Sequence, residues 1–284
     1  ALLSLAIVSL LGATAVSTSA EARERQDRKS SQKEENRYPD ATREEPKVKG
    51  SPKVQKKLHS MVDAYNKDDF AAARALADEI IATETATAYD RSVAGQIGSQ
   101  AAYNTDDTAG TIAYLKRAIE ENALDNNSHY QLMYMLAGAQ LQEAQFAEGL
   151  ATLDRYFAET KSQKPEDLVL KGQALYQSER YAEAIPVLKQ AIDSSPEPKD
   201  NWQQLLMASY AEAGQAGEAI KLAESIAAKS PDDKKAQLNL ANVYLQADQY
   251  DKAAVVMEKL RSAGQLTEEK DYRVLYSTYA NLDG

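Results

Sequence analysis

The sequence predicts an all-α fold, a right-handed α-solenoid of about six to seven helix–turn–helix repeats. Three observations support this prediction. Residues 165–196 place apolar or small residues at helical spacing in two blocks, which the polar stretch 177–180 separates. The same pattern recurs about every 35 residues in both directions along the chain. No stretch of the sequence has the pattern of a β-strand.

The pattern in residues 165–196 resembles the tetratricopeptide (TPR) unit of about 34 residues, which has small residues, an aromatic residue and a terminal proline at fixed positions. Small residues let two antiparallel helices approach closely. The proline ends the second helix because it cannot continue a helix that precedes it. The residues that match the unit's positions 8, 17, 20, 27 and 32 are Gly172, Tyr181, Ala184, Ala191 and Pro196.

Repeats are expected to begin near residues 54, 92, 130, 165, 200 and 234. The first two repeats are nearer 38 residues long, so we expect longer helices or loops there. A seventh repeat begins near Glu269, and the sequence stops at Gly284 before the second helix of that repeat. We therefore expect a fragment that lacks its C-terminal part, because a solenoid needs a capping helix over its last apolar face.

Aspartates occur where new helices are expected to begin. A carboxylate there can accept hydrogen bonds from free backbone N–H groups and interacts favourably with the positive end of the helix dipole. These residues are Asp68-Asp69, Asp106-Asp107, Asp167, Asp200 and Asp232-Asp233.

The chain before the predicted array (54–284) has two parts. Residues 1–16 are apolar or small, and small residues at 17–22 fit a cleavage site after Ala20 or Ala22. Residues 1–22 are thus predicted to be a signal peptide with an incomplete N-terminus; the alternative is a retained membrane anchor, although the run is shorter than the roughly 20 residues that span a bilayer. Residues 23–53 are predicted to be a disordered charged linker, because they can bury too little apolar surface to offset the entropy of ordering.

The array is acidic. Residues 21–53 hold ten of the chain's 33 basic residues and eight of its 43 acidic ones, which leaves 23 basic and 35 acidic residues, a net charge of −12, in residues 54–284. Nucleic acid is not an expected partner, because phosphate binding requires a basic stripe. A basic protein segment is favoured instead. Membrane contact is expected only through an uncleaved leader or the basic linker.

The sequence contains no pattern typical of catalysis or metal binding. There is no cysteine, and the two histidines, His59 and His129, are far apart in sequence with no second histidine nearby. No glycine-rich phosphate loop or nucleophile-elbow motif occurs. We expect no enzyme activity, no cofactor, no metal and no small-molecule substrate.

The TPR resemblance implies a concave groove, lined mainly by the first helix of each repeat, in which ligands bind. The expected groove residues are rich in amides and tyrosines, which can pair with the backbone of an extended peptide and offer apolar area with a polar tip. The alternative is that the tyrosines only pack between neighbouring repeats. The candidate groove residues are Tyr65, Asn66, Gln96, Gln100, Tyr103, Asn104, Gln131, Tyr134, Gln142, Gln173, Tyr176 and Gln177.

One subclass of TPR domain is not expected. TPR domains that bind the acidic C-terminus of chaperones use a clamp of lysines and asparagines at groove positions. Asn242 fits one such position but stands alone. No lysine occupies position 5 of any repeat, which holds Leu58, Gln96, Tyr134, Val169, Gln204 or Leu238.

The order of segments is similar to that of exported TPR proteins found beside TonB–ExbB–ExbD energy-transduction systems in Gram-negative bacteria. The similarity rests on residues 53–73, 118–158, 201–214 and 262–284, after an export signal. It implies a periplasmic accessory scaffold for TonB-dependent uptake of iron–siderophore complexes, with TonB, ExbB or ExbD components as partners. Two alternatives stay open: a scaffold for cell-envelope assembly, and a regulatory module of an enzyme that lies beyond residue 284.

Overall fold

The computed structural model of the chain describes residues 35–282. The chain divides into two compact units, residues 1–39 and residues 40–284. Only residues 35–39 of the first unit are described, so the fold reported below is that of the second unit. The predicted signal peptide and the beginning of the predicted linker lie outside the described residues.

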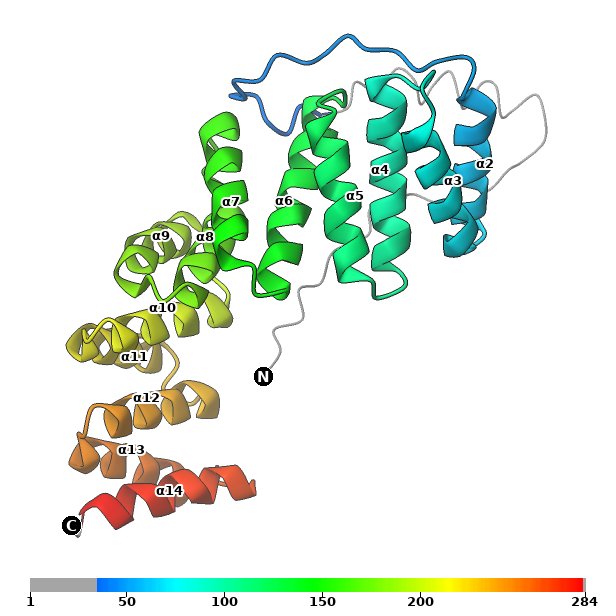
Figure 1. The fold of residues 1–284 in the computed structure, drawn as a ribbon. Coiled ribbons are helices and arrows are strands. Elements are labelled where there is room, and N and C mark those ends of the chain that lie inside the picture. Colours follow the sequence, from blue (N-terminus) through cyan, green and yellow to red (C-terminus); the bar gives the residue numbers. More distant parts are fainter. Residues whose placement is uncertain (1–34, 283–284) are drawn as a thin grey trace, which may run out of the picture. The chain divides into compact units, whose positions relative to one another are not determined.

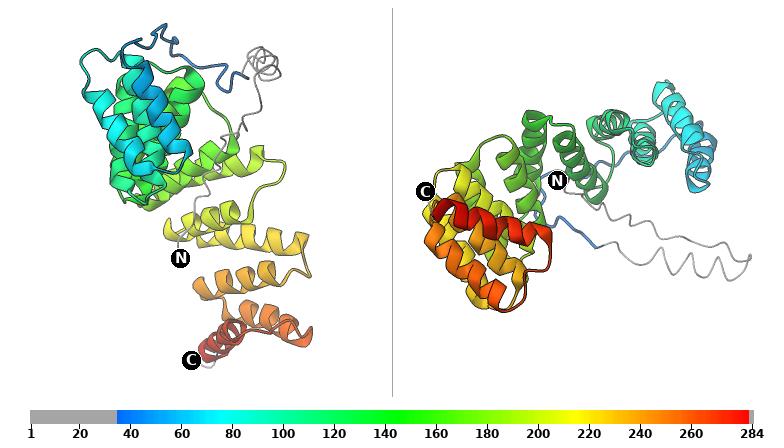
Figure 2. Two further views of the ribbon diagram at one scale, coloured as in Figure 1. Left: turned by 90° about the vertical axis from the view of Figure 1, so that its right-hand side faces the viewer. Right: turned by 90° about the horizontal axis from the view of Figure 1, so that it is seen from below.

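Residues 35–282 form thirteen α-helices and no β-strand, which confirms the all-helical prediction. The helices follow one another in chain order and each contacts the next one (Figures 1 and 2). None of these helices is both long enough and apolar enough to cross a membrane. The helices are α2 (Gln55–Asn66), α3 (Phe70–Ala82), α4 (Ala88–Tyr103), α5 (Thr108–Glu120), α6 (Asn126–Gln142), α7 (Phe146–Thr160), α8 (Pro165–Gln177), α9 (Tyr181–Ser194), α10 (Asp200–Glu212), α11 (Ala216–Lys229), α12 (Lys234–Gln246), α13 (Tyr250–Ser262) and α14 (Glu269–Leu282).

Six helix pairs and α14 correspond to the predicted repeats, with an error of register in two of them. The sequence predicts repeats that begin near 92 and 130, whereas α4 begins at Ala88 and α6 at Asn126. A capping box of Thr87 and Asp90 sets the start of α4, and the side chain of Asp125 caps α6. The long helices α4 and α6, of 16 and 17 residues, belong to the second and third repeats. The expectation of longer helices is thus met in the second repeat but not in the first, whose helices α2 and α3 have 12 and 13 residues.

Aspartates begin the helices at the predicted places. Asp69, Asp107 and Asp233 are the N-cap residues of α3, α5 and α12, and each side chain accepts a hydrogen bond from a backbone N–H in the first turn. Asp200 is the first residue of α10, and Asp167 is the third residue of α8. Their carboxylates lie where a negative charge stabilises a helix.

Small residues set the distance between the helices of a pair. A Cβ atom added at Gly172 of α8 would lie 2.4 Å from Cδ2 of Leu188 in α9, so these helices pack as closely as they do because residue 172 has no side chain. Ala184 and Ala191 of α9 are fully buried. The TPR pattern therefore predicted these contacts correctly. One buried apolar cluster continues from α6 through to α11, with members such as Ala137.

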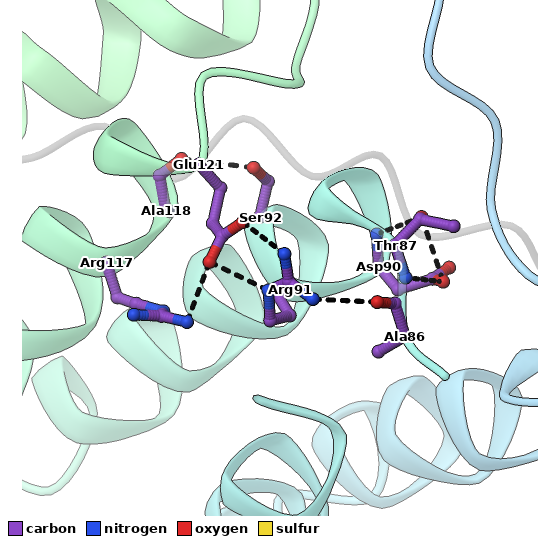
Figure 3. Close-up of polar contacts among 8 residues, drawn as sticks. All are labelled: Ala86, Thr87, Asp90, Arg91, Ser92, Arg117, Ala118 and Glu121. Carbon is purple, nitrogen blue, oxygen red and sulfur yellow. Dashed lines mark hydrogen bonds and ion pairs between the residues drawn. The ribbon is translucent and has the colours of Figure 1, made fainter. Parts of the chain in front are cut away.

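A polar network joins α4 to α5 (Figure 3). Arg91 donates through Nε and Nη2 to the two carboxylate oxygens of Glu121, at 2.8 and 2.7 Å, and Arg117 Nη2 lies 2.7 Å from the same carboxylate. Ser92 Oγ donates to the carbonyl oxygen of Ala118 at 3.1 Å. The hydrogen bonds from Arg91 lower the pKa of Glu121. This repeat is thus cross-linked by charge-assisted hydrogen bonds as well as by apolar packing.

Residues 40–51 form an extended segment, here called the N-terminal strap, that runs along the helix ends of the first three repeats (Figure 1). Thr42 N donates to the carbonyl oxygen of Glu159 in α7 at 2.8 Å, and Ser51 N donates to Asp90 in α4 at 2.9 Å. Between these points Arg43 binds the turn that joins α5 to α6. Polar groups at and near the helix ends supply partners for residues 40–51 that composition does not reveal. That residues 23–53 form a disordered linker stays a prediction.

Candidate functional site

The predicted groove residues lie on the first helices of the first four repeats, α2, α4, α6 and α8, with Asn104 as the C-cap of α4. Every one of them is exposed or half-buried. The structure brings two of them together across neighbouring repeats, because Asn104 Nδ2 donates to the hydroxyl of Tyr65 at 3.1 Å. That these side chains bind a partner stays a prediction.

Three of the four predicted groove tyrosines pack against an aromatic ring of the second helix in their own repeat. The sequence-based alternative placed such packing between neighbouring repeats, so its partners differ from those observed. The fourth, Tyr103, is 44% exposed. Intra-repeat packing therefore explains part of the tyrosine content without a ligand. The pairs, with the distances between ring centroids, are Tyr65–Phe70 at 5.6 Å, Tyr134–Tyr156 at 6.0 Å and Tyr176–Tyr181 at 5.2 Å.

A hollow of about 570 Å³ lies between α12 and α14. A smaller hollow of about 30 Å³ lies between α10 and α12 and shares Lys235 and Asn239 with the first. Together these hollows are here called the C-terminal groove. Its uncharged polar side chains come from the first helices of two repeats: Gln203 and Gln204 of α10, and Asn239 and Asn242 of α12. Charged side chains of both signs also line it: Asp200, Asp233, Lys234, Lys235, Glu268, Lys270 and Asp271.

The central feature of the C-terminal groove is a row of side chains on α12. Lys235, Asn239 and Asn242 follow one another at intervals of four and three residues, so they share one face of the helix. Within the described residues, neither the side-chain amide of Asn239 nor that of Asn242 has a hydrogen-bond partner. Each amide offers two donors and one acceptor group. The row can therefore form hydrogen bonds with the backbone of an extended peptide.

The lysines around the C-terminal groove are paired with carboxylates. Lys234 Nζ lies 2.6 Å from Oδ2 of Asp271, which is fully buried, and this hydrogen bond lowers the pKa of Asp271 while burial acts in the opposite direction. Both signs of charge thus surround uncharged amides, so hydrogen bonds to the backbone of an extended segment are the main contacts that the groove offers. The exposed pairs are Lys235–Asp200 at 2.8 Å and Lys270–Glu268 at 2.9 Å.

The sequence prediction stops at α8 and therefore missed the C-terminal groove. The sequence does contain a signal for this groove: the groove positions of the TPR pattern also exist in the repeats that begin at 200, 234 and 269. The i, i+4, i+7 spacing of Lys235, Asn239 and Asn242 marks the polar face of α12 in the sequence.

The described residues offer no grouping of three or more histidine, cysteine, aspartate or glutamate side chains that could hold a metal ion. His59 is exposed on α2. His129 is fully buried in α6, and burial lowers its pKa to about 4. The expected absence of a metal, a cofactor and enzyme activity stays a prediction.

Sequence models of the tetratricopeptide repeat family match residues 169–200 and residues 210–270. The matches cover most of α8 and α9 and extend from the end of α10 to the start of α14. These residues are therefore TPR repeats. The helices before them, α2 to α7, are also arranged as consecutive helix pairs. The fold is that of a TPR repeat protein.

Solved TPR structures are similar to the chain in fold. A tetratricopeptide repeat protein from Parabacteroides merdae ATCC 43184 is 11% identical with a TM-score of 0.55, over 81% of this chain and 100% of that one. YrrB, titled a TPR protein with an unusual peptide-binding site, is 14% identical with a TM-score of 0.51, over 66% and 92%. MamA from Desulfovibrio magneticus RS-1 is 17% identical with a TM-score of 0.51, over 62% and 97%. At these identities the likeness shows the fold alone. No curated protein sequence matches the chain.

Proposed function

We propose that this protein is a non-enzymatic scaffold that binds an extended segment of a partner protein in the C-terminal groove. The observation that carries the proposal is the row on α12, where the amides of Asn239 and Asn242 line a hollow of about 570 Å³ without a partner in the described chain. YrrB, which has a similar fold, is titled as having a peptide-binding site, and this supports a peptide as the ligand.

The chemistry of the groove indicates how a segment would be held. Amide side chains can pair with the N–H and C=O groups of an extended backbone, so they give affinity with little dependence on the bound sequence. The net charge of −12 over residues 54–284 favours a basic segment. Binding should therefore weaken as the salt concentration rises, because salt screens exposed charges.

We further propose that the protein acts in the periplasm as an accessory of TonB-dependent energy transduction and iron–siderophore uptake. Support comes from the resemblance of residues 53–73, 118–158, 201–214 and 262–284 to exported TPR proteins of TonB–ExbB–ExbD systems. The apolar run at residues 1–16, followed by small residues, supports export. The partner segment would then belong to TonB, ExbB or ExbD.

A photo-crosslinking amino acid at Leu238, which lines the groove, tests the binding proposal in intact cells. The same amino acid at Val255 of α13, which is 72% exposed and does not line the groove, is the matched control. We expect a defined crosslinked partner from position 238 alone, and its loss when Asn239→Ala and Asn242→Ala are added. Equal capture from both positions, or none from position 238, would contradict a groove-bound partner.

The identity of the captured protein tests the role in TonB-dependent transport. Recovery of TonB, ExbB or ExbD, together with slow growth of a deletion strain on iron-limited medium, supports that role. Normal growth under iron limitation together with a leaky envelope would instead support the alternative of a cell-envelope assembly scaffold.

A further inference from the structure

The N-terminal strap contacts the turn between α5 and α6 and the first residue of α6. The last carbonyl groups and the first N–H groups of any helix lack partners within that helix. Arg43 Nη2 donates to the carbonyl oxygens of Leu124 and Asn122, just past the end of α5, at 2.9 and 3.1 Å. The N–H of Asn126, the first residue of α6, donates to Oε1 of Glu45 at 3.0 Å. The carboxylate of Glu45 thus lies at the N-terminus of α6, as the helix dipole favours, and the guanidinium of Arg43 lies against carbonyl oxygens of the turn.

The guanidinium group of Arg43 is held on several sides. Its Nε donates to Oδ1 of Asn122 at 2.7 Å, and its Nη1 donates to Oδ1 of Asn126 at 2.6 Å. Asn126 also donates through Nδ2 to the carbonyl oxygen of Arg43 at 3.1 Å, so one asparagine forms hydrogen bonds with both the side chain and the backbone of Arg43. The planar fork of arginine fits this set of oxygens, whereas the single ammonium group of lysine does not.

The strap is held like a bound ligand and not like a part of the core. No residue from 40 to 51 is buried. The hydrogen bonds of Thr42, Arg43 and Glu45 described above all reach forward to residues of the array. The receiving groups belong to the first residue of α6, to the end of α7 and to the turn that joins α5 to α6. The groups that bind the strap therefore form a site that fits an extended peptide.

We propose that the turn between α5 and α6 is a second peptide-binding site of the array, which recognises an extended segment with an arginine followed two residues later by a glutamate. The chain's own residues 42–45 occupy it. A partner segment of the same chemistry binds there when the strap is displaced. This proposal is independent of the C-terminal groove. The strap is attached to the site through a short linker, so its effective concentration is in the millimolar range and a free segment must compete against it.

A labelled peptide of residues 38–49 tests this site on the full-length chain by fluorescence anisotropy. In the double variant Arg43→Ala/Glu45→Ala the strap loses the two side chains that bind the turn, and only its backbone hydrogen bonds remain at the turn, while the site keeps Asn122 and Asn126. We expect saturable binding of the peptide to this variant. Binding to the unchanged chain should be at least tenfold weaker, because its own strap fills the site. Adding Asn126→Ala to the double variant should also weaken binding at least tenfold.

Two controls complete the experiment. The strap variant Glu44→Ala/Lys47→Ala changes charged residues that do not contact the site, so it should bind the peptide as weakly as the unchanged chain. A peptide with Arg43→Ala should not bind any form. The proposal is overturned if the double variant shows no saturable binding, or if all forms bind the peptide equally. Circular dichroism should show unchanged helix content in each strap variant, because no strap residue is buried, and it checks that α6 is intact when Asn126→Ala is added.

Discussion

The first three helix pairs, α2 to α7, and the helices that follow, α8 to α14, share one architecture but are stabilised differently. The TPR family models match within the second region, where the helices are 13 or 14 residues long. The first region contains helices of 16 and 17 residues and carries the strap and the Arg91–Glu121 network (Figure 3). The second region contains the C-terminal groove.

The difference lies in the polar contacts. The side chains of Arg91 and Glu121 are 24% and 11% exposed, whereas those of Arg180 and Glu183 in the second region are 47% and 59% exposed. Exposed pairs contribute at most about 1 kcal/mol to stability. In the first region, where α4 and α6 are longer than the 13 or 14 residues of the later helices, sheltered polar side chains and the strap hold the helix ends. Where the repeats are regular, small apolar residues hold most helix pairs together, and the sheltered pair Lys234–Asp271 joins α12 to α14.

The largest effect should come from the apolar core, which the two regions share. Leu115 of α5 and Leu188 of α9 are both fully buried. Replacing either one by alanine should lower the free energy of unfolding by about 2–5 kcal/mol, measured by urea denaturation. Val255→Ala, at a side chain that is 72% exposed, should change it by no more than about 0.5 kcal/mol. A much smaller loss for Leu115→Ala would mean that the two regions do not depend equally on apolar packing.

His129 should make the stability of the first region depend on pH. Burial, followed by the charges of Arg43 and Arg155, lowers its pKa from 6.5 to about 4, against the opposite effect of Glu159 and Asp125. Between these pKa values the unfolded chain binds a proton that the folded chain does not. The free energy of unfolding should therefore fall as the pH falls from 6.5 to 4, by up to about 3 kcal/mol.

The variant His129→Leu isolates this contribution, because other groups also titrate over the same range. Urea denaturation at pH 7 and pH 4 should show a smaller loss of stability on acidification for the variant than for the unchanged chain. Equal losses in the two proteins would show that His129 is not held neutral by burial.

The next effect should separate the sheltered ion pair of the first region from an exposed pair of the second. Glu121→Ala leaves the guanidinium of Arg91 without its carboxylate in a largely covered place and should cost about 1–3 kcal/mol. Glu183→Ala removes an exposed partner of Arg180 and should cost no more than about 0.5 kcal/mol. Thermal unfolding monitored by circular dichroism measures both. Similar small losses would show that the network in Figure 3 adds little to stability.

The smallest effect should come from the turns inside the repeats. Ala144, after α6, and Gly214, after α10, both adopt positive φ, at 56° and 71°. Ala144→Gly should raise the free energy of unfolding by up to about 1 kcal/mol, because glycine adopts this conformation without strain. Gly214→Ala should lower it by about 1 kcal/mol, since no atom lies within 4 Å of the added Cβ and only the backbone is strained. Changes of the same sign in both variants would contradict this account.

Much of the second region could be predicted from the sequence. The predicted repeat starts at 165, 200, 234 and 269 coincide with the first residues of α8, α10, α12 and α14. In the first region counting by repeat length placed two starts four residues too late, because the caps at Thr87 and Asp125 set the actual starts. The candidate site was less predictable. The groove positions were applied only as far as α8, and the sequence does not show how far apart α12 and α14 lie.

The sequence by itself determined the helices, their pairing and the close contact at Gly172, because apolar spacing, capping residues and small residues act over a few turns of chain. Only the tertiary structure decided the strap and the C-terminal groove. The side-chain partners of Arg43 lie 79 and 83 residues further along the chain, and they form one site only after α5 and α6 have packed. The hollow likewise depends on the separation of two helices from different repeats, a distance that local sequence does not encode.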